Sequence, residues 1–542
     1  MMSTVGVAAR SSETPEQRAL HQICTEALRQ PTDGLGRPLP VSGVFSGGRL
    51  DDGKTYTSPI EQVAFIQNGR RFLPIFYLTH QDSIDGYSPT PSPSDVTALE
   101  YVRDNRLPLC FVTTQWERNF YDYSSFYTRP FETNPLLYDL TQELVTRDST
   151  YLVDPLGPIQ AWEELGEDWH DQGNIVDWQL ETLYPDPPFV LILSNHEARK
   201  SYPPEADSSY RYIAAHGSST IDDEKRRHYG DGWVARFLAM FNSFRARLPP
   251  GWQDCRFVGY RVDETSYYGR WPDWSAIWPL YTSIPEWTWG PEHRAWDGSC
   301  YESYLASYYG NSDFQVNSPQ VDAGNHIPQL AEVRETKQDY WDERIFWDGW
   351  VPDGHPEDWR AWYASQGQTW NAVRYKGMIQ LCMWLSCPRV VREYRNTYEA
   401  RDDIGFEYLD VVLDAVDSVH ENVVLRRFWR HGALVLNSAE SHPYTVNIPS
   451  EIQIAERWFL LTVDLNPAQP YPTFSTEILA FALARVIGEA PNREWLVYAH
   501  SPRQARTGVV ITVPGYGNIT VDVSVAGSFY LVDEAAETVT AV

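Results

Sequence analysis

The stretch Phe189-Val190-Leu191-Ile192-Leu193-Ser194-Asn195-His196-Glu197-Ala198 decides how the rest of the sequence is interpreted. Five apolar residues open it, and polar residues follow abruptly. A short continuous apolar run is typical of a strand buried on both faces, as in a parallel sheet. In α/β enzymes the chemistry lies at the carboxyl ends of such strands. The stretch therefore predicts a parallel sheet and makes Glu197 the first candidate for a catalytic residue.

Apolar runs alternate with helical patterns on both sides of this stretch. The other predicted strands are 72–78, 107–113, 256–260, 314–319 and 344–347. The predicted helices are 92–105, 135–147, 158–171, 222–248 and 407–424. This alternation indicates crossover helices between parallel strands, and its length fits an α/β fold of the (β/α)8 (TIM) barrel type better than an open sheet. No glycine-rich nucleotide-binding motif follows an early strand, which weakens the open-sheet alternative.

The pattern changes after residue 435, where short strands are separated by turn signals. These strands are predicted at 457–463, 478–487, 494–500, 508–513, 519–525 and 528–532. Turn signals such as Pro514-Gly515-Tyr516-Gly517 between them indicate an all-β sandwich. We therefore expect an N-terminal helix and loop segment at 1–60, a barrel catalytic domain at 61–437 and a β-sandwich domain at 438–542. Within the first two parts, 31–60 and 265–312 are predicted to be loops.

Composition and charge narrow the possible partners. With 44 Lys and Arg against 73 Asp and Glu, the net charge is −29, which argues against nucleic acid or an anionic membrane as partner. No apolar run approaches the ~20 residues of a membrane span. The first residues lack a basic-then-apolar secretion signal, so we expect either a cytoplasmic chain or one whose signal has been removed. The cysteines are scattered, and neither HExxH nor GxSxG is present, so no metal and no cofactor are predicted.

Acidic residues follow four of the predicted strands. They occur in Gln115-Trp116-Glu117, Asn195-His196-Glu197, Asp263-Glu264 and Trp347-Asp348. An acidic residue after a strand can simply cap the next helix. Several of them at the end where barrels place their active sites favour a catalytic role instead. Glycoside hydrolysis needs two such carboxyl groups, one protonated acid and one charged nucleophile or base. Glu197 is the preferred acid/base because it follows a wholly apolar strand. Apolar surroundings that exclude part of the water raise the pKa of a carboxyl group by desolvation.

The segment Ser194-Asn195-His196-Glu197-Ala198 resembles the strand-end Asn-Glu signature of retaining (β/α)8-barrel glycoside hydrolases, the large clan A group. The resemblance implies that Glu197 is the acid/base and that Asn195 contacts the substrate. Here His196 separates two residues that are adjacent in that group. The clan places the partner carboxylate after a late strand, which implies Asp348, ranked ahead of Asp263 and Glu264. A small β-sandwich after the barrel is also similar to that group.

Aromatic residues are unusually frequent, with 22 Trp, 33 Tyr and 21 Phe. Sugar rings stack on aromatic side chains, although large cores also bury them. The candidate stacking residues are Trp116, Trp271, Trp274, Trp287, Trp289, Trp296, Trp347 and Trp350, some of which we expect in the core. Polar or further aromatic substrate contacts are expected from Asn195, His196, Glu117, His80 and Tyr260. The candidate general bases among the histidines are His80, His196, His293 and His326.

The sequence thus favours a glycoside hydrolase that acts on a polysaccharide or oligosaccharide. Two alternatives stay open: a non-catalytic carbohydrate-binding or structural protein on a barrel scaffold, and a polysaccharide lyase using Tyr, His and Arg. Whether hydrolysis retains or inverts configuration depends on the distance between the two carboxyl groups.

Overall fold

A computed structural model describes part of the chain. The described residues are 38–42, 75–78, 93–113, 128–147, 150–188, 190–194, 209–217, 223–260, 295–300, 348–351, 364, 367, 369, 371–388, 390–393, 403–435, 461–463, 480–501 and 504–542. The chain divides into two compact units, one formed by Val41–Cys300 and the other by Met1–Pro40 with Tyr301–Val542. The predicted domain boundaries at 60 and 437 stay predictions.

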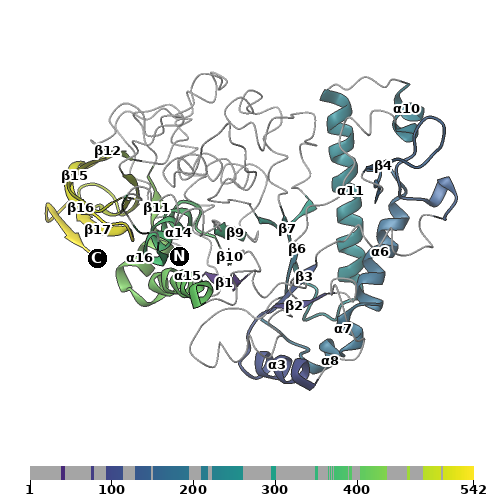
Figure 1. Ribbon diagram of the computed structural model, residues 1–542, viewed down its shortest axis with the longest axis horizontal. Helices are drawn as coiled ribbons and strands as arrows, with labels where there is room; N and C mark the ends of the chain where they lie inside the picture. The colour runs from purple at the N-terminus through teal and green to yellow at the C-terminus, as the bar shows by residue number, and fades with distance from the viewer. Residues whose placement is uncertain are drawn as a thin grey trace. The chain divides into compact units, whose positions relative to one another are not determined.

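The unit Val41–Cys300 contains a parallel sheet (Figure 1). Its strands lie in the order β8-β7-β6-β3-β2, the order of the chain. Their bounds are β2 (Ile75–Tyr77), β3 (Leu109–Thr113), β6 (Val190–Ser194), β7 (Arg256–Tyr260) and β8 (Gly298–Cys300). The opening stretch of the sequence is therefore confirmed as a parallel strand between two others. β8 falls inside the predicted loop 265–312, because Gly-Ser-Cys carries no apolar signal.

Both faces of this sheet are buried. Phe111, Ile192 and Phe257 join one large core cluster with the helices, while Leu191 and Val258 on the opposite face are also fully buried. This explains why the strands appear in the sequence as continuous apolar runs.

Helices cover the first face of the sheet. Among the described residues of this unit, the helices are α3 (Pro93–Asp104), α6 (Ile159–Asp171), α7 (Asn174–Asp177), α8 (Leu180–Leu183), α10 (Tyr210–His216) and α11 (Asp223–Arg247). α6 and α11 lie side by side (Figure 1) and interlock through Trp162, Trp233 and Phe237, whose rings meet edge to face or stacked at 5.5–5.8 Å. Gly166 permits this close approach, since a Cβ there would lie 2.1 Å from the Met240 carbonyl oxygen.

The helix predicted at 135–147 is wrong. This stretch follows a short 3-10 helix η3 (Phe131–Thr133) and is extended, ending in β4 (Thr146–Arg147), which pairs with β5 (Thr150–Tyr151). The Asp139 carboxylate accepts the backbone N–H groups of Thr141 and Glu143, at 2.8 and 3.0 Å. Such local side-chain bonds compete with the helical pattern, and they form a turn here.

In the other unit, β9 (Asp348–Val351) and β10 (Val390–Glu393) pair in parallel. β1 (Leu39–Ser42), at the boundary between the units, lies beside β10 and falls in the predicted loop 31–60. The helices are α14 (Ala372–Ser386), α15 (Asp403–Glu421) and α16 (Val423–His431). Asn371 and Asn422 cap the first turns of α14 and α16 by accepting backbone N–H groups.

Antiparallel strands follow, in two sheets of order β11-β13-β14-β17-β18 and β12-β15-β16. The bounds are β11 (Ala433–Leu434), β12 (Thr462–Val463), β13 (Phe481–Ile487), β14 (Glu494–His500), β15 (Arg506–Val513), β16 (Gly517–Val523), β17 (Ser528–Asp533) and β18 (Thr538–Ala541). Residues of both sheets, among them Val497 and Ile511, share one hydrophobic core. Several predicted strands are thereby confirmed, and β18 was not predicted.

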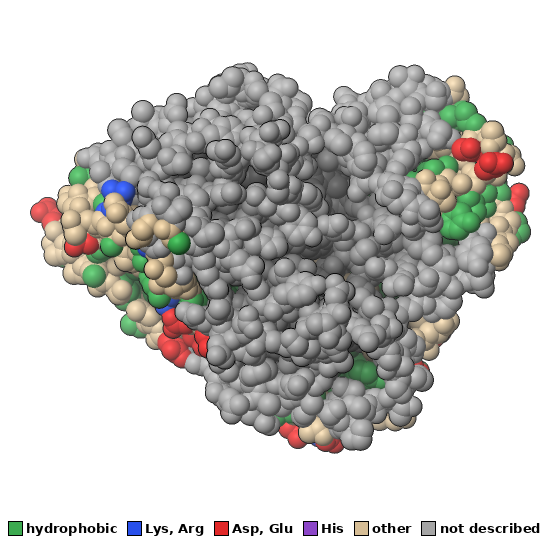
Figure 2. Space-filling model, in the orientation of Figure 1, with side chains coloured by type: hydrophobic (Ala, Val, Ile, Leu, Met, Phe, Trp, Pro, Cys, Tyr) green, Lys and Arg blue, Asp and Glu red, His purple; other side chains and the backbone are tan. Residues whose placement is uncertain are grey.

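The described surface reflects the acidic composition. On the face drawn in Figure 2, carboxylates gather in several places, whereas Lys and Arg side chains are sparse among the described residues. Among the helices that the structure describes, none is long and apolar enough to cross a membrane.

Candidate functional site

The carboxyl ends of β3, β6, β7 and β8 lie along one edge of the sheet. Thr113, the last residue of β3, pairs with Ser194, the last residue of β6. On the other side, Leu193 pairs with Val258, and Tyr260 pairs with Cys300 at the ends of β7 and β8. Segments that leave these strands therefore start from neighbouring points, which is where α/β folds place their sites.

Most predicted site residues belong to the segments that start at this edge and lie outside the described residues. Asn195, His196 and Glu197 directly follow β6, and Asp263 and Glu264 come soon after β7. Trp116 and Glu117 follow β3, and His80 follows β2. Trp347 and the further candidates Trp271, Trp274, Trp287, Trp289, His293 and His326 are outside the described residues as well. Tyr260 is the last residue of β7.

Asp348 has a different backbone position from the predicted one. The sequence suggested a strand at 344–347 that ends just before Asp348, but Asp348 is the first residue of β9 and pairs with Val390. Trp350 is the third residue of the same strand. Asp348 thus opens a described parallel strand instead of following it, whereas Asp263 and Glu264 follow one.

Trp296 belongs to the core. Only 6% of its surface is exposed, and its ring packs against Phe237 and Phe241 with centroids 5.1 and 4.8 Å apart. A buried ring offers no free face to a sugar, so its predicted stacking role is corrected to a packing role. The sequence could not separate these roles, because both ring partners lie on α11, far away in the chain.

Two acidic residues at strand ends escaped the sequence analysis. Glu302 comes two positions after β8, and Glu393 is the last residue of β10, where it pairs with Val351 at the end of β9. Both strands were missed because their sequences give little signal. β8 contains no apolar run, and β10 contains only two apolar residues, Val390 and Val391, shortly after Pro388. A search for acidic residues after any short β-branched pair would have found Glu393.

A charged cluster fixes the start of β7 and β8. The Asp297 carboxylate accepts the Phe257 backbone N–H at 2.8 Å and pairs with the Arg245 guanidinium. Arg245 also donates to the Cys255 carbonyl at 3.0 Å. Burial raises the pKa of the Cys255 thiol to about 12, so this cysteine stays protonated and inert. The strand that leads to Asp263 and Glu264 is therefore held firmly at its amino end.

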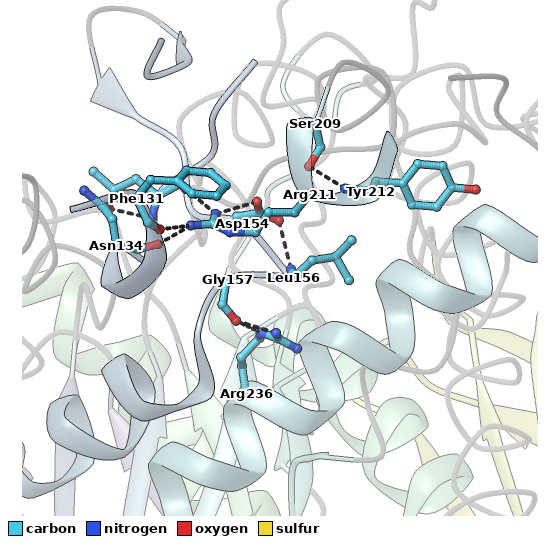
Figure 3. A network of polar contacts seen from close by, with 10 residues as sticks. Phe131, Asn134, Asp154, Leu156, Gly157, Ser209, Arg211, Tyr212 and Arg236 are labelled. Atoms are coloured by element: carbon cyan, nitrogen blue, oxygen red, sulfur yellow. Dashed lines mark hydrogen bonds and ion pairs between the residues drawn. The ribbon is translucent and has the colours of Figure 1, made fainter. Parts of the chain in front are cut away.

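A second cluster holds the helix that follows the Glu197 segment. Arg211 on α10 reaches Asp154 and the carbonyl groups of Phe131 and Asn134 (Figure 3). Asp154 is fully buried, and its other oxygen accepts the Leu156 backbone N–H at 2.8 Å. These contacts join α10 to the extended segment between η3 and α6.

Arg236 on α11 makes a comparable contact nearby (Figure 3). It donates to the Gly157 carbonyl at 2.8 Å through Nε and to the Gly232 carbonyl at 3.2 Å. Burial lowers the pKa of Arg236 to about 10, which still leaves it charged at neutral pH. This arginine ties α11 to the start of α6 and has no hydrogen bond to α10 among those described.

Within the described part of the chain, His, Cys, Asp and Glu side chains form no group of three or more that could hold a metal ion. Cys110, Cys255 and Cys387 are all buried.

The comparisons with known proteins give distant likenesses only. No family model matches the chain, and a search of curated proteins finds no match. A crystal structure of the glucosidase II alpha subunit is 8% identical, with a TM-score of 0.38 over 96% of this chain and 47% of that one. A second glucosidase II structure, of the heterodimeric complex, gives 7% identity and a TM-score of 0.39, again over 96% and 47%.

The PgaB (BpsB) glycoside hydrolase domain from Bordetella bronchiseptica is 11% identical, with a TM-score of 0.32 over 60% of this chain and 95% of that one. The chain spans about half the length of the glucosidase II chains, since it covers 47% of each. TM-scores of this size do not establish a shared fold or activity.

Proposed function

We propose that this chain is a glycoside hydrolase that cleaves a polysaccharide or oligosaccharide. One observation carries the proposal: β3, β6 and β7 are adjacent, parallel and in register, and acidic residues follow each of them. Glu197 follows β6, and Asp263 with Glu264 follows β7. Neighbouring strands lie about 4.8 Å apart, so carboxyl groups leaving them can approach the roughly 5–5.5 Å that a retaining mechanism needs.

In this proposal residues 61–437 form a (β/α)8 barrel. Two features support it: the strand order follows the chain, and both faces of the sheet in Val41–Cys300 are buried, as a filled barrel interior requires. The antiparallel sheets form a β-sandwich domain at 438–542, and 1–60 is an N-terminal segment. The hydrophobic core that the two antiparallel sheets share supports the sandwich.

Glu197 acts as the general acid/base, and Asn195 and His196 contact the sugar beside it. The second carboxylate comes from Asp263 or Glu264, with Asp348 as the remaining candidate. The first two are favoured because β7 is the neighbour of β6, while Asp348 opens a strand. Trp116, Glu117, His80, Tyr260, Trp347 and Trp350 are proposed substrate contacts. The chemistry needs neither metal nor cofactor.

Screening the purified protein against a panel of polysaccharides tests the function. Newly released reducing ends are expected with at least one of them, and Glu197→Gln should abolish the release. The matched control is Glu163→Gln, an exposed position on α6. An unsaturated product would indicate a lyase. Tight calorimetric binding without any product would favour a non-catalytic carbohydrate-binding protein, and either outcome would overturn the proposal.

The partner carboxylate is identified by comparing three variants on the same substrate. Asp263→Asn or Glu264→Gln should lose nearly all turnover, while Asp348→Asn should keep most of it. The reverse result would place the second carboxylate on β9 and overturn the assignment to the segment after β7.

A further inference from the structure

Helix α14 packs against β14 so closely that the helix has no room for a side chain at the point of contact. A Cβ added at Gly377 would lie 2.5 Å from two atoms of the His500 ring, Cδ2 and Nε2, and 2.6 Å from the Val525 carbonyl oxygen. The Tyr498 hydroxyl donates to the Gly377 carbonyl. The glycine therefore brings the backbone of the helix directly onto the ring of His500.

A second contact joins the end of α14 to the same five-stranded sheet. Arg485 on β13 is fully buried and donates to the Trp384 carbonyl at 2.8 and 3.1 Å. The Trp384 ring meets the Phe529 ring of β17, with centroids 5.4 Å apart. The contact between helix and sheet thus runs along α14 from Gly377 to Trp384, and both of these residues are buried.

His500 is the weak point of this contact. Its side chain is fully buried, and neither ring nitrogen makes a hydrogen bond of normal geometry with a described residue. It pairs with Phe481 on β13, and the charge that acts on it is that of Arg374 on α14, which is also positive. Lys376, a second cation of α14, pairs instead with Asp414 on α15. A neutral ring fits this place, whereas a charged ring would have neither water nor a described carboxylate to stabilise it.

We propose that His500 makes the contact between α14 and the five-stranded sheet sensitive to acid, because protonation of its ring separates the helix from the sheet while the antiparallel strands stay paired. This device is independent of the proposed hydrolase activity.

The proton affinities of the two states give the direction of the effect. Burial, together with the Arg374 charge, lowers the pKa of His500 from 6.5 to about 3, and the Val525 carbonyl opposes this shift. Once the contact opens and the ring reaches water, its pKa returns to about 6.5. The closed contact therefore rejects a proton that the open contact accepts, so acid favours opening below about pH 6.5.

The core of the two antiparallel sheets is separate from this contact. Side chains alternate between the two faces of a strand, and Val497 and Ala499 of β14 belong to the core that the sheets share. Tyr498 and His500 therefore lie on the opposite face, which packs against α14. β14 also keeps its pairing with β13 on one side and β17 on the other, so the strands remain paired when the helix separates.

Hydrogen–deuterium exchange of the full chain at pH 7 and pH 5, corrected for the intrinsic pH dependence of exchange, tests the proposal. Between these two pH values the equilibrium should shift toward the open form by about 25-fold, since pH 5 lies below the pKa of the free ring and well above that of the buried one. A helix without its packing is marginal in water, so peptides covering 372–386 should exchange about 25-fold faster at pH 5. Peptides covering 506–523, in the hairpin of β15 and β16, should not change.

Four variants separate His500 from other groups that titrate. His500→Gln should lose most of the acid response, and His500→Leu, of similar volume, replaces it if the glutamine variant folds poorly. His431→Gln removes an exposed histidine at the end of α16 and should respond like wild type. Gly377→Ala should speed exchange of 372–386 at both pH values, because its methyl group overlaps the ring.

Three results would overturn the proposal. The first is no acid response of 372–386 in wild type. The second is the same response in His500→Gln and His500→Leu as in wild type, which would assign it to another group. The third is equal acceleration of 506–523, which would show that acid unfolds the antiparallel strands together with the contact.

Discussion

The hairpin of β15 and β16 and the parallel-sheet unit are each held by side-chain contacts, and these contacts span very different distances along the chain. In the hairpin of β15 and β16, the Thr512 hydroxyl donates to the Asn518 side chain only six positions away. In the parallel-sheet unit, Arg211 binds partners 57 to 80 positions away. Local contacts can be inferred from a local pattern, whereas distant ones depend on the completed fold. The proposed active site lies in the region of distant contacts.

Removing a buried ion pair in the parallel-sheet unit should have the largest effect on stability. Asp154→Ala leaves Arg211 partly buried without its carboxylate and should lower the free energy of unfolding by about 3–5 kcal/mol. The corresponding change among the antiparallel strands is Glu534→Ala, which removes the partner of Arg493 at a more exposed position. It should cost only about 1 kcal/mol. Urea unfolding measures both, and equal losses would remove the contrast between the regions.

Lowering the pH should reduce the stability of the C-terminal region because of His500. This histidine is the last residue of β14 and is fully buried. Burial lowers the pKa of His500 from 6.5 to about 3, with a contribution from the Arg374 charge and opposed by the Val525 carbonyl. The unfolded chain therefore binds a proton that the folded chain rejects, so stability is full above pH 6.5 and falls as the pH drops toward 3. The loss is on the order of a few kcal/mol.

His500→Gln, which does not titrate, provides the comparison. Between about pH 6.5 and 5, where few carboxyl groups titrate, wild type should lose more stability than the variant, in which the other histidines still titrate. Parallel curves in this window would show that His500 is not the responsible group.

The turn between β15 and β16 should give a smaller effect. Gly517 has φ +122°, a conformation that a residue with a Cβ rarely adopts, so Gly517→Ala should cost about 1–3 kcal/mol. Gly508 has φ +67°, and a Cβ added there would meet no described atom within 4 Å, so Gly508→Ala should cost about 1 kcal/mol. Thermal unfolding compares the two, and a larger loss at Gly508 would contradict a turn-based register for this hairpin.

The sequence likewise predicted features that depend on local signals better than features that depend on distant contacts. β14 has the predicted bounds, Glu494–His500, because alternation and flanking turns are local signals. The run that forms β6 was equally clear. In contrast, the segment 135–147 has a helical pattern, but Asp139 closes a turn there instead. The burial of Trp296 depends on rings of α11 that no local pattern reveals.

From the sequence, the candidate site could be predicted only through the positions of the strand ends. Parallel pairing of β3, β6 and β7 brings the starts of their following segments to one edge, as the apolar runs suggested. The ion pair of Arg211 and Asp154, which holds α10, was not foreseen, since neither residue belongs to a motif. The position of Asp348 within β9 also required the paired backbone, because strand bounds shift easily by a few residues.

The turnover number of Glu197→Gln on the polysaccharide cleaved by wild type tests the central claim most directly. Loss of the general acid/base should lower kcat by about 10²–10⁴-fold, with an unchanged unfolding midpoint and full activity in Glu163→Gln. Turnover by Glu197→Gln at the wild-type rate would contradict the assignment of Glu197 and, with it, the proposed active site at the carboxyl end of β6.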